Sequence, residues 1–123
     1  MKEEEILIGY KVVRIPLKKN ANYFESFTNI KSVKKKYRIN KWTKRSKNRG
    51  ALAVFKTLLY AKTFKHIIYN IGQFKIFKCE YVKSKINYLA YKKHYIPFRK
   101  YIEDVPLGTD FAEKVKLIKR IKA

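Results

Sequence analysis

The stretch from residue 51 to residue 82, ALAVFKTLLYAKTFKHIIYNIGQFKIFKCEYV, decides the expected fold. ALAVFK (51–56) is a short apolar run, which predicts a buried strand. Over residues 58–70 the apolar residues recur at helical spacing, which predicts a helix with Thr57 as its N-cap. QFKIFKCEYV (73–82) has apolar residues on both faces and predicts a central strand. The stretch therefore predicts a β-α-β unit, whose two strands could be parallel.

Two segments outside that unit also have the composition of strands. EILIGYKVVRI (5–15) is rich in β-branched residues and is followed by Pro16, which ends a strand. Residues 115–121 alternate between apolar and basic side chains, which favours a last strand over a helix. A turn is expected just before it, at Pro106-Leu107-Gly108.

The remaining segments leave the number of helices open. Residues 17–30 fit either a short helix or a loop held by aromatic side chains, and residues 36–44 fit an edge strand. Ser84 could cap a further helix that ends before Pro97. We therefore expect a single basic α+β domain over residues 1–123, with four to five strands and two or three helices.

The distribution of charge is the main functional clue in the sequence. Acidic residues are absent between Glu25 and Glu80, and the 54 residues between them carry 15 Lys or Arg. Ten of these cations lie in KSVKKKYRINKWTKRSKNRG (31–50), and the formal net charge of the chain is +22. Such a segment repels itself unless an anionic partner is near. The pattern indicates a nucleic-acid partner, with RNA favoured, or an RNA-containing nucleoprotein complex.

The candidate contact residues are the cations of this segment and the single tryptophan, because phosphates attract Lys and Arg and an aromatic ring can stack on an unpaired base. They are Lys34, Lys35, Lys36, Arg38, Lys41, Trp42, Lys44, Arg45, Lys47 and Arg49. A second basic patch is expected at Lys92, Lys93, Arg99 and Lys100. For Trp42 itself, packing in the core is favoured over base stacking, since large aromatic side chains are usually buried.

Four fragments of the chain together resemble a pattern of small phage-encoded α+β proteins. They are YKVVR (10–14), ALAVFKTLLYAKTF (51–64), IFKCEYVKS (76–84) and VPLGTDFAEKVKLIK (105–119). That group is largely uncharacterised, so the resemblance carries over no catalytic residues. It implies an accessory or anti-defence role, such as inhibition of a CRISPR complex. The basic segment 31–50 departs from the pattern, which is where the particular function of this chain is expected.

Catalytic and metal-binding patterns are weak in this chain. Two histidines and one cysteine do not have the spacing of a zinc site, and the four glycines are isolated, so no phosphate-binding loop is present. The acids Glu103, Asp104, Asp110 and Glu113 cluster, but capping and charge balance explain them better than Mg²⁺ binding in a nuclease. We expect a protein that is not an enzyme and that needs no metal or cofactor.

Two alternatives remain open. One is an inhibitor that docks on an acidic protein surface of a host enzyme without contacting nucleic acid. The other is an enzyme, either a nuclease or an ADP-ribosyltransferase-like protein that would use His94 and Glu103. Membrane binding is disfavoured because residues 31–50 lack a coherent apolar face. The acidic N-terminus and the lone Cys79 favour a cytoplasmic protein, in the host cytoplasm if it is phage-encoded.

Overall fold

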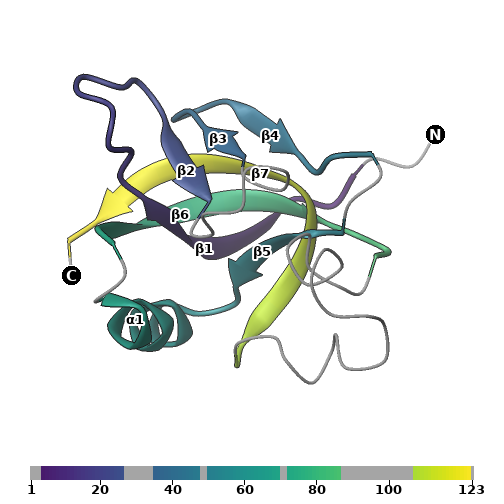
Figure 1. Ribbon diagram of the computed structural model, residues 1–123. Helices are drawn as coiled ribbons and strands as arrows, with labels where there is room; N and C mark the ends of the chain where they lie inside the picture. The colour runs from purple at the N-terminus through teal and green to yellow at the C-terminus, as the bar shows by residue number, and fades with distance from the viewer. Residues whose placement is uncertain (1–3, 27–34, 48–49, 70–71, 87–106, 123) are drawn as a thin grey trace.

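The computed structural model describes residues 4–26, 35–47, 50–69, 72–86 and 107–122 (Figure 1). These parts of the chain contain seven strands and one helix. In chain order they are β1 (Leu7–Arg14), β2 (Phe24–Ser26), β3 (Lys36–Tyr37), β4 (Trp42–Lys44), β5 (Leu52–Phe55), α1 (Leu58–Ile67), β6 (Phe74–Lys83) and β7 (Thr109–Ile121).

The predicted α+β class is wrong, because the described residues form one largely antiparallel sheet with a single short helix. The elements with a clear periodicity are present as β1, β5, α1, β6 and β7. The strands β2, β3 and β4 have only two or three residues each, too few to give a periodic pattern, so the prediction undercounted the strands. Most of the helix expected between Ser84 and Pro97 lies outside the described residues.

The predicted β-α-β unit is also wrong in its pairing. β5 pairs antiparallel with β1 and with β7, and β6 pairs antiparallel with the same two strands along nearly its whole length. The pairings β1–β5, β5–β7, β7–β6 and β6–β1 therefore close into a ring. Within the described sheet β5 and β6 are not neighbours. The prediction that residues 73–82 form a central strand is confirmed, since β6 has a partner on each side.

Alternation along the strands separates an interior from an outer face. The interior contains buried side chains from β1, β5, β6 and β7, among them Val13, Val54, Phe77 and Leu117. Cys79 lies there with no exposed surface and packs as a small apolar side chain. Gly9 also faces this interior, where an added Cβ would lie 2.9 Å from the carbonyl oxygen of Phe55 and from the ring of Tyr81. The barrel is thus closed tightly enough to need a glycine at that position.

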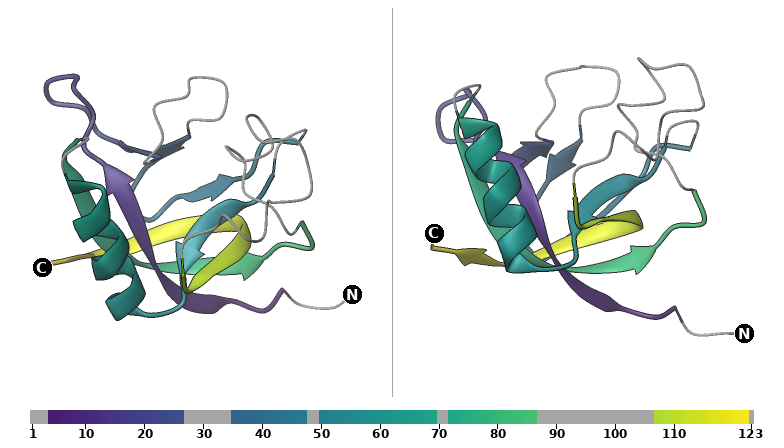
Figure 2. Two further views of the ribbon diagram at one scale, coloured as in Figure 1. Left: turned by 60° about the horizontal axis from the view of Figure 1, so that its bottom comes forward. Right: turned by 90° about the horizontal axis from the view of Figure 1, so that it is seen from below.

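The helix covers one end of the outer face. Val12, Ile76 and Ile121 form a row across β1, β6 and β7, and they pack with Ala61 and Phe64 of α1. Figure 2 shows α1 lying against the sheet at the end where the C-terminus lies.

A lysine is buried inside the barrel. Lys11 is 3 % exposed, its Nζ donates a hydrogen bond of 2.5 Å to the carbonyl oxygen of Ala53, and it lies 5.0 Å from the ring centroid of Tyr37. Burial lowers the pKa of Lys11 to about 8, and it raises the pKa of Cys79 to about 12. Both groups are buried, so they affect the stability of the protein and do not react with solutes.

The N-terminus of α1 is capped as predicted. The hydroxyl of Thr57 accepts a hydrogen bond of 3.3 Å from the backbone N–H of Tyr60, and Thr57 has an extended backbone. Thr57→Ala is expected to lower the free energy of unfolding by about 1 kcal/mol, measured by urea denaturation, because an N–H of the first turn loses its partner.

Thr63→Ala is the matched control for the capping prediction. The hydroxyl of Thr63 donates a hydrogen bond of 2.9 Å to the carbonyl oxygen of Leu59 inside the helix. This carbonyl also has a backbone partner in the helix, so the hydroxyl does not cap a helix end. Alanine has the higher helix propensity, so this change is expected to be neutral or slightly stabilising. Equal losses for the two variants would contradict a capping role for Thr57.

Candidate nucleic-acid interface

A groove lies where β3 turns into β4. The edge strand expected over residues 36–44 is broken at Asn40, which has a φ of 63°, a conformation that Asn tolerates better than most residues. The chain therefore forms two short strands, and the hydroxyl of Thr43 donates 3.2 Å to the carbonyl oxygen of Lys36 between them. The β3–β4 groove has a volume of about 540 Å³ and is lined by Lys35, Lys36, Arg38, Lys41, Trp42 and Thr43.

Half of the predicted contact residues gather in this groove. Lys44 and Lys47 are exposed further along the same segment, and Arg45 is partly buried. The predicted residues that lie outside the described part of the chain are Lys34, Arg49, Lys92, Lys93, Arg99 and Lys100. The second basic patch expected from the sequence therefore stays a prediction.

The cations of the basic segment differ in whether they form an ion pair with a described carboxylate. Nε of Arg45 lies 2.7 Å from Oε1 of Glu113, and the backbone N–H of Arg45 also donates to Glu113. Arg45 therefore joins β4 to β7, and its role as a contact residue stays a prediction. Of the groove cations, Lys36, Arg38 and Lys41 form no ion pair with any described carboxylate.

None of the four described ion pairs uses a cation that lines the groove. They join Arg45 to Glu113, Lys83 to Asp110, Lys114 to Glu4 and Lys116 to Glu80. These four pairs therefore do not neutralise the cations of the groove. One carboxylate lies near them along the strands, because Glu25 is directly opposite Lys36 in the β2–β3 pairing.

Trp42 lies on the outer face of the barrel and not in its core. Its register partner in β7 is Lys116, whereas the next residue, Thr43, lies opposite the buried Val115. The ammonium groups of Lys114 and Lys116 lie 4.7 Å and 5.1 Å from the centroid of the Trp42 ring. Core packing, which the sequence favoured for this residue, is therefore wrong, and the ring is half-buried under lysine side chains.

Tyr23 adds a second ring beside the groove. The Lys36 ammonium lies 4.6 Å from its centroid and the Arg38 guanidinium lies 5.9 Å from it. Rings held this way limit the freedom of the cations beside them. The sequence did not indicate Tyr23, Lys114 and Lys116 as groove residues, because only strand pairing brings them to the basic segment.

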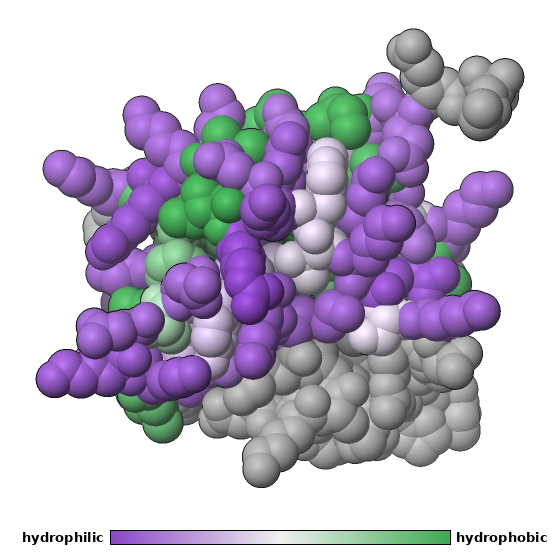
Figure 3. Space-filling model, turned by 90° about the horizontal axis from the view of Figure 1, so that it is seen from above, coloured by the Kyte–Doolittle hydropathy of each residue, from purple (hydrophilic) through white to green (hydrophobic). Residues whose placement is uncertain are grey.

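The chemistry of the groove is that of a binding surface. Ammonium and guanidinium groups donate charge-assisted hydrogen bonds to phosphate oxygens, and they need no proton transfer to do so. Figure 3 views the side of the molecule where β2, β3 and β4 lie, and hydrophilic side chains project over most of its described surface. Among the described residues no three His, Cys, Asp or Glu side chains are grouped so that they could hold a metal ion.

No family model, no curated protein and no solved structure matches this chain. In the part of the chain that the structure describes, no helix has both the length and the apolar character to cross a membrane.

Proposed function

We propose that this protein binds nucleic acid, RNA in preference to DNA, through the β3–β4 groove, and that it does so without catalysing a reaction. The observation that carries the proposal is the set Lys36, Arg38 and Lys41, three cations outside the described ion pairs that line one groove together with the half-buried Trp42. The target is a free strand or the RNA of a nucleoprotein complex.

A single strand suits this groove better than a duplex. Its backbone phosphates would contact the three cations, and each contact would release condensed counterions, which makes the affinity dependent on salt. The ring of Tyr23 lies beside Lys36, and the ring of Trp42, which has Lys114 over it, lines the same groove, where an unpaired base could reach these rings. Aromatic stacking on splayed bases is the usual way in which proteins recognise single-stranded RNA.

The biological setting of the proposal follows from the resemblance to small phage-encoded proteins. On that basis we propose an accessory or anti-defence factor, such as an inhibitor of a CRISPR complex, that acts in the host cytoplasm. The competing candidate is an inhibitor that uses the same cations to dock on an acidic protein surface.

Binding to labelled single-stranded RNA, measured by fluorescence anisotropy over a series of salt concentrations, tests the proposal. With three phosphate contacts, the logarithm of the association constant is expected to fall with the logarithm of salt at a slope of about −2. An elevated ratio of absorbance at 260 nm to 280 nm in the purified protein would agree with this result. Absence of binding at about 50 mM salt would overturn the proposal and leave docking on a protein surface.

A further inference from the structure

A second group of cations lies around the helix, and the sequence did not single it out. The side chains of Lys65, Lys75, Arg120 and Lys122 line a depression of about 420 Å³ where α1, β6 and β7 meet. Lys65 also borders a second depression, of about 510 Å³, with Lys62, His66 and Tyr69. These side chains come from three elements that are far apart in the sequence.

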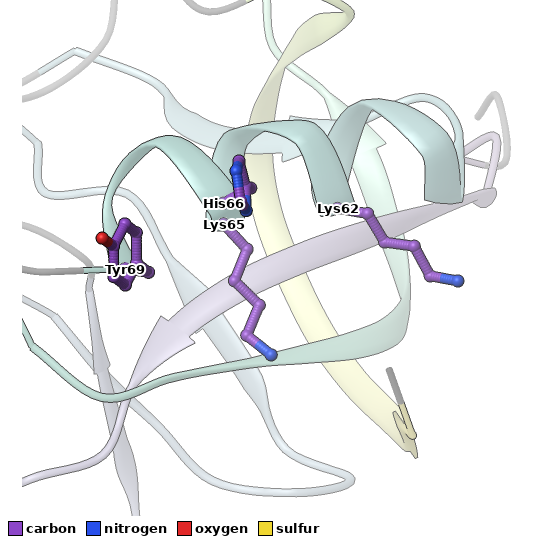
Figure 4. Close-up of a pocket in the computed structure, with 4 residues that line it drawn as sticks. All are labelled: Lys62, Lys65, His66 and Tyr69. Carbon is purple, nitrogen blue, oxygen red and sulfur yellow. The ribbon is translucent and has the colours of Figure 1, made fainter.

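Aromatic rings accompany these cations, as they do in the β3–β4 groove. The rings of His66 and Tyr69 are stacked, with their centroids 5.9 Å apart and an interplanar angle of 21°. Tyr69 is 70 % exposed, so one face of this pair is open to a ligand. Figure 4 shows Lys62, Lys65 and His66 along α1 and Tyr69 just after the end of this helix. We call the four cations and this ring pair the helix-side surface.

The charge of the helix-side surface is uncompensated among the described residues. None of Lys65, Lys75, Arg120 and Lys122 forms an ion pair with a described carboxylate. Next to them, Lys78 and Lys119 lie directly opposite each other on β6 and β7. Like charges at such positions destabilise a sheet. A bound polyanion would relieve this repulsion, so charge complementarity identifies the kind of partner.

The helix-side surface is separate from the β3–β4 groove. Lys116, which lies over Trp42, and Lys122 are six residues apart along β7, a separation of about 20 Å in an extended strand. In Figure 1, α1 lies below the sheet and β3 and β4 lie above it. A nucleotide seated in the groove would therefore not reach the helix-side surface from the same position.

We propose that the helix-side surface is a second nucleic-acid site, so that one chain holds two nucleic-acid segments at the same time. The cations would contact backbone phosphates, and the His66–Tyr69 pair would stack with an unpaired base. Bridging of two segments requires the proposed binding by the groove. Binding of phosphates by the helix-side surface does not depend on the groove. The expected activity is the joining of two strands by the free protein.

A capture assay tests this proposal. One RNA is fixed on beads, the protein is added, and the retention of a second, fluorescently labelled RNA is measured. The helix-side variant is Lys75→Glu, Arg120→Glu and Lys122→Glu, and the groove variant is Lys36→Glu, Arg38→Glu and Lys41→Glu. The control variant, which has the same charge change at exposed positions outside both surfaces, is Lys18→Glu, Lys19→Glu and Lys56→Glu.

The wild type and the control variant are expected to capture the labelled RNA. The helix-side variant should still bind one RNA in solution but lose capture, because three lost contacts weaken its second site about 100-fold at about 0.1 M salt. An equimolar mixture of groove and helix-side variants should not restore capture, since neither chain has both sites. Circular dichroism checks that each variant is folded.

Three results would overturn the inference, and each is distinct from failure of the proposed function. The first is a wild type that binds RNA but does not capture a second strand. The second is a helix-side variant that captures the labelled RNA as well as the wild type does. Capture restored by the mixed variants would show that bridging comes from association of two chains. The proposed function fails on different results: the wild type does not bind RNA, or the three groove substitutions leave the RNA affinity of the helix-side variant unchanged.

Discussion

Charge reversal of the β3–β4 groove, by Lys36→Glu, Arg38→Glu and Lys41→Glu in a chain that already carries the helix-side variant, is expected to weaken binding of single-stranded RNA by about 100-fold at about 0.1 M salt. Each phosphate contact with a single strand contributes about 0.7 to the slope of log affinity against log salt, so three lost contacts remove about 2. The salt slope of the variant should therefore become shallower, and titrations over a salt series measure both quantities together.

The groove residues make this variant a clean test. Lys36, Arg38 and Lys41 are exposed and form no ion pair with a described carboxylate, so their replacement breaks no described ion pair. Lys36→Glu places a second carboxylate opposite Glu25 in the β2–β3 pairing, so the urea denaturation of the variant must be compared with that of the wild type. If the variant has the urea midpoint of the wild type and also its full affinity for RNA, the groove is not part of the RNA interface. The control variant Lys18→Glu, Lys19→Glu and Lys56→Glu has the same net charge, so loss of binding there as well would indicate an effect of overall charge only.

Local patterns predicted the elements of this fold but not their assembly. The periodicity of residues 58–70 and the cap at Thr57 depend on neighbours in the chain, and α1 follows them closely. Closure of the sheet depends on pairings such as Leu52 with Ala112, which join residues far apart in the sequence. No pattern within a short window contains that information, so β5, α1 and β6 were interpreted as a β-α-β unit.

The same distinction applies to the candidate sites. The groove was predicted in part because Lys35, Lys36, Arg38 and Lys41 are close in sequence, so that the charge is visible as a run. The helix-side surface was missed because its cations are spread from residue 65 to residue 122. Each of them is a single lysine or arginine on an ordinary strand or helix, and only the fold collects them.

Lys11 provides the second large effect, and it concerns stability. Because residues of β1 alternate between the two faces, Lys11 points into the barrel with Val13, and it forms no ion pair with a described residue. Desolvation disfavours the ammonium form, which is why the pKa of Lys11 falls from 10.5 to about 8. The difference corresponds to a destabilisation of about 3 kcal/mol wherever the lysine is charged in both the folded and unfolded states.

The pH dependence follows from the direction of this shift. Below pH 8 the lysine is protonated in both states, so the full cost is present. Between pH 8 and 10.5 the unfolded chain binds the proton and the folded chain does not, so the contribution of Lys11 to stability rises with pH. Lys11→Met keeps an unbranched side chain that is one heavy atom shorter, and it removes the charge. We expect it to raise the free energy of unfolding at pH 7 by about 2 kcal/mol, after about 1 kcal/mol is subtracted for the lost hydrogen bond to Ala53.

The measurement must compare the variant with the wild type at each pH, because Cys79 acts in the opposite direction. Burial raises the pKa of this thiol from 9.0 to about 12, so the unfolded chain loses that proton first and stability falls above pH 9. Both proteins share this loss, and it largely cancels in their difference. The stabilisation by Lys11→Met should therefore shrink as pH rises from 7 to 10, whereas Lys56→Met, at an exposed position after β5, should show no such trend. A constant difference across this range would mean that the ammonium group of Lys11 is not desolvated in the folded protein.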